Sequence, residues 1–135
     1  MFRNAKTELA PVGAILLGVG LVVFGASAIG AYSEALRVPG VGAGFYEHAS
    51  NFGITYLVVA LLCVVRLFYG ASRTELTITS VVILIVVTVY ELWGWLNTPD
   101  CVDVAFGAAG AVLGYLTALA ICSWGLRPRA KKRRG

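Results

Sequence analysis

The chain has 135 residues, of which 59% are hydrophobic and only 13% are charged, and its formal net charge is +4. Its mean hydropathy of +0.82 lies far above the range of water-soluble domains. The composition therefore excludes a soluble globular protein and predicts an integral membrane protein. The links between the apolar segments are too short to fold as a separate soluble domain.

Four apolar segments, taken in chain order, predict four membrane-spanning helices. They cover residues 12–32, 48–69, 77–96 and 104–126, and a basic tail follows at 127–135. Each segment is close to the ~20 residues that cross about 30 Å of hydrocarbon. The sequence thus predicts an all-α four-helix membrane bundle that forms a single domain over residues 1–135.

The first apolar segment shares features with a secretory signal peptide. A basic start, an apolar run and the small residues Ala26, Ser27 and Ala28 follow one another. However, the run is about 21 residues long, whereas the apolar part of a cleaved signal has roughly 7 to 15. We therefore expect a helix that is retained as an anchor.

The positions of the basic residues predict the orientation. Lys and Arg precede the first segment, surround the link 70–76 and fill the tail, whereas Arg37 is alone on the other side. Basic residues near helix ends stay cytoplasmic, so both termini are expected in the cytoplasm and the helices in a cell (inner) membrane of bacterial type. The tail lacks the interleaved aromatic residues of nucleic-acid-binding segments. It therefore predicts an anchor that attracts anionic lipids, and no nucleic-acid partner.

The head of the second helix carries a polar face that includes the only histidine. His48, Asn51 and Thr55 recur at helical spacing and lie together on this face. Three interpretations are open: an external ligand site, an interfacial histidine without a ligand, or axial contact with a haem or chlorophyll-type pigment. A single histidine does not supply a cage of several histidines, so no metal site and no other cofactor are expected.

Three carboxylates lie in or near the predicted link between the third and fourth helices, residues 97–103. Glu91 lies within a predicted spanning helix, where a charge costs roughly 2.5–3.5 kcal/mol. It is interpreted as a proton-coupled group, a general acid or base, or a partner of a lipid headgroup, or else as a partner of Arg37 or His48. Asp100 or Asp103 is expected to cap the fourth helix, a role that still leaves an oxygen to line a ligand site.

The fourth helix has a face of small residues. Gly107, Gly110 and Gly114 follow the small-xxx-small spacing that lets membrane helices approach closely. The first helix is also rich in glycine, so we expect these two helices to pack tightly, against each other or against a second chain. Membrane lipids and a homo-oligomer or larger membrane-protein complex are therefore the expected partners.

The motifs between residues 46 and 116 occur in a recognisable order. A helical glutamate, Glu91, precedes the D-x-x-D turn of Asp100 and Asp103, and the G-x-x-G-x-x-x-G-Y pattern that begins at Gly107 follows. This order resembles the VanZ-like family, whose earlier H-F-x-x-Y element looks like His48, Asn51 or Phe52, and Tyr56. The resemblance implies a membrane protein of the cell envelope, associated with low-level resistance to teicoplanin. It matches Glu91 to the family's glutamate, Asp103 to its turn aspartate, and Gly110 and Gly114 to its glycine ladder.

The chain departs from that family beside the carboxylates. Gly94 stands where the family often has a glutamine, and the residues at 97–99 replace its usual arginine. These two residue types would bind an anionic or amide-bearing ligand, so the resemblance transfers the fold better than the chemistry.

Three functions are weighed from the sequence. The first is a VanZ-like envelope protein, without assigned catalysis, whose outward polar residues bind a lipid or cell-wall-related ligand; these residues are His48, Asn51, Glu91, Asp100 and Asp103. The second is an accessory subunit of a respiratory or photosynthetic membrane complex, packed against partner helices, lipids or pigments. The third is a small proton-coupled exporter, which is ranked last because its acid lies near the outer end and not at the midplane.

Overall fold

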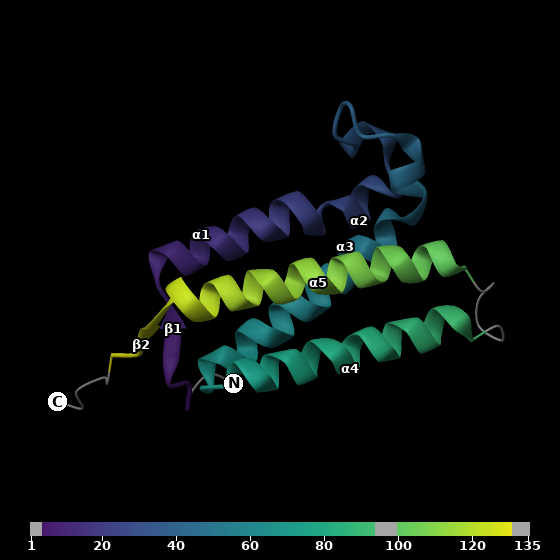
Figure 1. Cartoon of the computed structure of the whole chain (residues 1–135). Coiled ribbons are helices and arrows are strands. Elements are labelled where there is room, and N and C mark those ends of the chain that lie inside the picture. The colour runs from purple at the N-terminus through teal and green to yellow at the C-terminus, as the bar shows by residue number, and fades with distance from the viewer. Residues whose placement is uncertain (1–3, 94–99, 131–135) are drawn as a thin grey trace.

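The computed structural model describes residues 4–93 and 100–130, and most of them are helical (Figure 1). The helices are α1 (Pro11–Gly20), η1 (Leu21–Gly25, a π-helical turn), α2 (Ser27–Gly30), η2 (Glu34–Leu36), α3 (Ala43–Phe68), α4 (Arg73–Leu92) and α5 (Cys101–Trp124). Two short strands, β1 (Thr7–Leu9) and β2 (Leu126–Pro128), pair antiparallel. This strand pair corrects the expectation of an all-α chain. Three-residue strands carry too little alternation to be recognised in the sequence.

Among the described residues, four helices are long and apolar enough to cross a membrane, which confirms the predicted helix count. They are the continuous segment Pro11–Gly30 formed by α1, η1 and α2, and the helices α3, α4 and α5. The two middle helices begin earlier than the hydropathy suggested, at Ala43 and Arg73. The α4 helix also ends at Leu92, four residues before the predicted boundary at 96.

A capping box explains the early start of α4. The backbone N–H of Glu75 donates to the Ser72 hydroxyl (3.3 Å), and the backbone N–H of Ser72 donates to the Glu75 carboxylate (2.6 Å). This reciprocal pair satisfies backbone donors at the helix start, so the helix continues through polar residues that lie outside the apolar run. The predicted boundary was wrong because it followed hydropathy alone.

The core lies between α3, α4 and α5. α3 packs mainly against α5, and α4 covers both of them. The buried cluster contains Val59, Cys63, Val64, Leu67, Leu76, Ala111, Ala118 and Ile121. The segment Pro11–Gly30 packs against α3 and α5, and it is more exposed than either of them. The pair α3 and α5 therefore forms the packed centre of the molecule.

The glycine face of α5 packs against α3. A Cβ atom added at Gly110 would overlap the carbonyl oxygen of Phe52, and one added at Gly114 would press on Tyr56 and Val59. The sequence had suggested the first helix as the partner of this face. α1 does meet the end of α5, where the backbones of Gly13 and Gly125 touch, but Gly110 and Gly114 face α3, and Gly107 lies between Val87 of α4 and Thr55 of α3. A small-residue pattern indicates that a helix is thin without indicating what lies against it.

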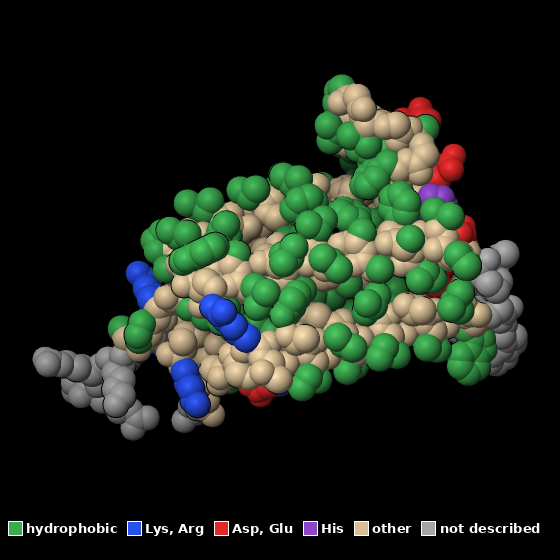
Figure 2. All heavy atoms as spheres, in the orientation of Figure 1, with side chains coloured by type: hydrophobic (Ala, Val, Ile, Leu, Met, Phe, Trp, Pro, Cys, Tyr) green, Lys and Arg blue, Asp and Glu red, His purple; other side chains and the backbone are tan. Residues whose placement is uncertain are grey.

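Charge is divided between the two ends of the bundle. Figure 2 shows the Lys and Arg side chains at the end that holds the strands, whereas the histidine and several acidic side chains lie at the opposite end. The basic end holds Lys6, Arg66, Arg73, Arg127 and Arg129, and its two acids are paired there. Glu8 accepts from Arg127 at 2.8 Å, and Glu75 accepts from Arg66 at 3.4 Å. The backbone of Lys6 bonds to Phe68 and Arg129, which holds both described chain ends at this side.

Candidate functional site

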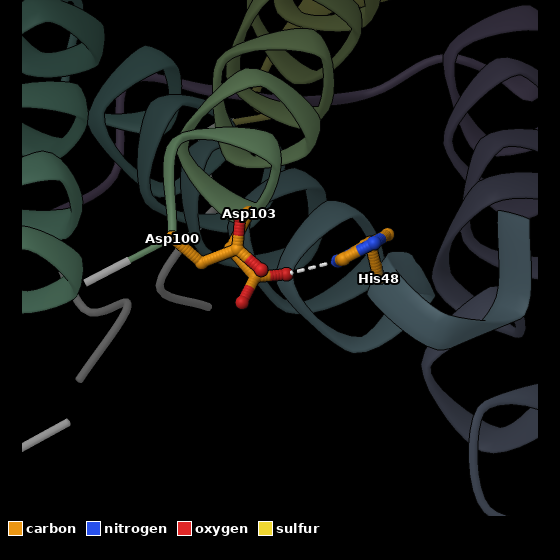
Figure 3. A group of neighbouring side chains, drawn as sticks. All are labelled: His48, Asp100 and Asp103. Atoms are coloured by element: carbon orange, nitrogen blue, oxygen red, sulfur yellow. Dashed lines mark hydrogen bonds and ion pairs between the residues drawn. The ribbon is translucent and has the colours of Figure 1, made fainter. Parts of the chain in front are cut away.

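The acidic end contains a direct contact between α3 and α5. The imidazole Nδ1 of His48 donates to Oδ1 of Asp103 at 2.6 Å, and each side chain is 21% exposed. His48 lies in the second turn of α3, and Asp103 lies in the first turn of α5. The two residues meet because the glycine face of α5 lets the helices run close together up to this end (Figure 3).

Asp100 completes a group of three side chains. One of its carboxylate oxygens, Oδ1, accepts a hydrogen bond from the backbone N–H of Val102 at 2.8 Å, so Asp100 is the cap of α5. This contact confirms that one of the two aspartates caps the helix, and it leaves the second oxygen of Asp100 available. His48, Asp100 and Asp103 each offer one ligand atom, and these atoms lie within 4.8 Å of one another. Such an arrangement can hold a cation or accept several hydrogen bonds from a polar ligand.

One aromatic ring packs against the imidazole of His48, and another aromatic ring packs against that ring in turn. The ring of Phe106 lies 5.2 Å from that of His48, and Phe45 lies 5.6 Å from Phe106. Phe45 also contacts Tyr46 and Phe52, with ring centroids 5.2 Å and 5.7 Å away. The imidazole is therefore held between an apolar wall and a carboxylate, which fixes its orientation.

An apolar pocket begins on the other side of Phe45. It has a volume of about 680 Å³, within the usual range of ligand pockets. Its walls come from the η1–α2 part of the first membrane segment, from the loop before α3, and from the first three turns of α3: Val22, Val23, Phe24, Ala26, Ser27, Leu36, Val38, Val41, Phe45, Tyr46 and Phe52. Phe45 therefore joins the apolar pocket to the polar group of His48, Asp100 and Asp103.

Arg37 lies at the edge of the apolar pocket. Its guanidinium carbon is 5.0 Å from the centroid of Tyr46, one of the pocket residues. Its Nε donates to the carbonyl of Gly30 at 2.9 Å, and its Nη1 lies 3.8 Å from the carboxylate of Glu34. From the sequence, Arg37 was assigned to the orientation argument and was considered as a partner of Glu91, but not as a residue of the ligand site. Its position as the only basic residue in the links of the acidic end was the signal that could have identified it.

The other predicted site residues have different surroundings. Asn51 is partly buried one turn after His48, and Thr55 is buried at 2% exposure, facing Gly107. Glu91 is 3% exposed, is not without a partner, and is not a member of the group of three ligand side chains. Because α4 ends at Leu92 and not at the predicted residue 96, Glu91 lies in its last turn. Trp95, the turn 97–99 and the tail from 131 onward lie outside the described residues.

The fold and the site define a helical protein with four candidate membrane spans and a polar, partly exposed group of side chains at one end. No protein-family model, no curated protein and no solved structure matches this chain. The function must therefore be argued from the site itself.

Proposed function

We propose that this chain is a multi-pass membrane protein of the cell envelope, of VanZ-like type, which binds an amphipathic lipid or cell-wall-related ligand at its acidic end. One observation carries the proposal: the apolar pocket and the polar group of His48, Asp100 and Asp103 share the aromatic wall of Phe45 and Phe106. A ligand with an apolar tail and a polar head matches these two adjoining environments.

The chemistry of each part indicates how such a ligand lies. An acyl chain fills the apolar pocket. The surfaces of the chain and of the pocket walls are thereby removed from water or from looser lipid contacts. Hydroxyl or ammonium groups of the head donate to the carboxylates of Asp100 and Asp103, while Arg37 offers a guanidinium group to a phosphate. The arrangement binds and orients a ligand, and no catalytic step is assigned to it.

Photo-crosslinking tests where the ligand lies. The full chain is reconstituted with phosphatidylethanolamine that carries a diazirine in one acyl chain, irradiated, and digested for mass spectrometry. We expect the crosslinks to concentrate in residues 22–27 and 36–52, which supply the pocket walls. Crosslinks spread evenly along the exposed face of α4 would show general lipid contact and would contradict a specific pocket.

The charge division supports a definite orientation, with both termini in the cytoplasm and the polar group outside. Arg66, Arg73, Arg127 and Arg129 lie at the end that holds both described chain ends, as expected for a cytoplasmic face. Cys101, exposed at the start of α5, reports on the other end. A membrane-impermeant maleimide should label Cys101 in intact cells, or in spheroplasts if an outer membrane blocks access, and the Cys101→Ser variant should lose this label. If Cys101 is labelled only after lysis of the membrane, the orientation is the opposite of the one proposed.

A second candidate is a subunit of a larger membrane complex. The α4 span is only 17% buried within the chain, and its exposed face includes Val82, Ile85, Val86 and Val89. Such a face suits helices of partner subunits as well as lipid chains. Measuring the mass of the intact particle separates the two candidates.

A further inference from the structure

We propose that His48, Asp100 and Asp103 form a binding site for a divalent transition-metal ion of the Zn²⁺ type. Their ligand atoms converge within 4.8 Å although they come from two helices and, in the case of His48 and Asp103, from positions 55 residues apart. Figure 3 shows the imidazole and the two carboxylates directed toward the same region. No metal site was expected from the sequence, because a single histidine does not make a cage of several histidines. In the fold, two carboxylates join that one histidine.

The type of ion follows from the donor atoms. One imidazole nitrogen with two carboxylate oxygens suits borderline ions such as Zn²⁺, Mn²⁺ and Fe²⁺, whereas Ca²⁺ and Mg²⁺ prefer sites made of oxygen alone. Zn²⁺ takes both donor types in tetrahedral sites, in which neighbouring ligand atoms lie roughly 3 to 3.5 Å apart. Nδ1 of His48 and Oδ1 of Asp103 lie 2.6 Å apart and all three ligand atoms lie within 4.8 Å of one another, so side-chain rotations must adjust these spacings when an ion binds.

The charge and the free oxygens of the group also favour a cation. Asp103 has one oxygen beyond the one that accepts from His48, and Asp100 has one beyond the oxygen that caps α5. Arg37, the basic side chain described at this end, is already engaged with Glu34 and the Gly30 carbonyl. A divalent ion compensates the two adjacent carboxylates and replaces the proton on Nδ1, which moves to Nε2 of a neutral imidazole or leaves to solvent from an imidazolium.

The surroundings allow an ion to enter and then hold it. His48 and Asp103 are each 21% exposed, so the site is reached from the surface, while the Phe106 ring fixes the inner side of the imidazole. Three protein ligands leave a fourth position of a tetrahedral ion open. A phosphate oxygen of the proposed ligand would take that position, and this last step alone rests on the proposed function.

A titration with Co²⁺ tests the site without any lipid. The full chain, purified in detergent with a chelator and then freed of it, is titrated with Co²⁺, whose visible absorption reports tetrahedral coordination, and Zn²⁺ is then added in competition. We expect saturation at one ion per chain, displacement by Zn²⁺, and no displacement by equimolar Mg²⁺ or Ca²⁺. His48→Gln and Asp103→Asn should each weaken binding at least about tenfold.

Two further variants make the result decisive. Glu47→Gln removes an exposed carboxylate next to His48 and should leave the affinity unchanged. Cys101→Ser should also have no effect, and a thiolate charge-transfer band that disappears in this variant would place the ion on Cys101 and overturn the proposal.

Circular dichroism verifies that each variant is folded. Equal binding by wild type and His48→Gln, or no saturable binding by folded wild type, would also overturn it. Lipid crosslinking repeated after chelation shows separately whether the proposed function holds without the metal.

Discussion

Replacing Gly110 by alanine should lower the stability of the folded chain by about 1–3 kcal/mol, the usual effect of overpacking a tight contact. The added Cβ would overlap the backbone carbonyl of Phe52 and approach the backbone nitrogen of Tyr56, so α3 and α5 must move apart. Backbone atoms cannot rotate away as a flexible side chain can. The thermal unfolding midpoint of the detergent-solubilised protein, followed by circular dichroism, measures the loss.

Gly18 provides the matched control for this variant. It lies in α1, also inside a membrane segment, and a Cβ added there meets nothing within 4 Å. Gly18→Ala should therefore leave the unfolding midpoint unchanged or raise it, because alanine favours helix by up to ~1 kcal/mol over glycine. If Gly110→Ala and Gly18→Ala behave alike, the close approach of α5 to α3 is wrong. The same movement would separate Asp103 from His48, so Gly110→Ala should also weaken metal and lipid binding.

Filling the apolar pocket should release the lipid. Val41 lines the pocket and is 41% exposed, and its replacement by tryptophan places a large ring in the space proposed for the acyl chain. We expect Val41→Trp to reduce lipid retention at least about tenfold, equivalent to ~1.4 kcal/mol of binding free energy. Native mass spectrometry of the purified chain, with the bound lipid identified after release, measures the retention.

Leu61→Trp is the control for this second prediction. Leu61 is 43% exposed and lies on α3, outside the residues that line the pocket. The two variants thus add the same ring at similar exposure in different places. Equal loss of lipid in both would mean that tryptophan disturbs the membrane surface in general, and retention in both would remove the pocket from the proposal.

The fold was predicted as far as hydropathy determines it. Four apolar runs predicted the four helices that, within the described residues, are long and apolar enough to cross a membrane, because a helix satisfies the backbone of an apolar run internally. The starts of α3 and α4 were misplaced because polar residues such as Glu47 and Glu75 continue the helices beyond the apolar runs. The β1–β2 pair depends on the two chain ends meeting, which is a tertiary property that no local pattern records.

The sequence indicated which residues could form the candidate site, but not how they are arranged in space. His48, Asp100 and Asp103 were predicted to belong to one outward polar site, but the direct contact of His48 with Asp103, which joins positions 55 residues apart, was not predicted. The apolar pocket is assembled from three segments, among them the η1 turn, and had no signature in the sequence. The predicted helix end at residue 96 placed Glu91 further from the end of α4 than it lies, because α4 ends at Leu92.

The most direct test of the central claim is native mass spectrometry of the wild-type chain, extracted from its membrane in a mild detergent. The proposed function predicts a particle that retains a defined lipid or lipid-linked cell-wall component, with at least one such molecule per chain and no other protein. A chain that carries no lipid, or one that always travels in fixed ratio with other subunits, would contradict it.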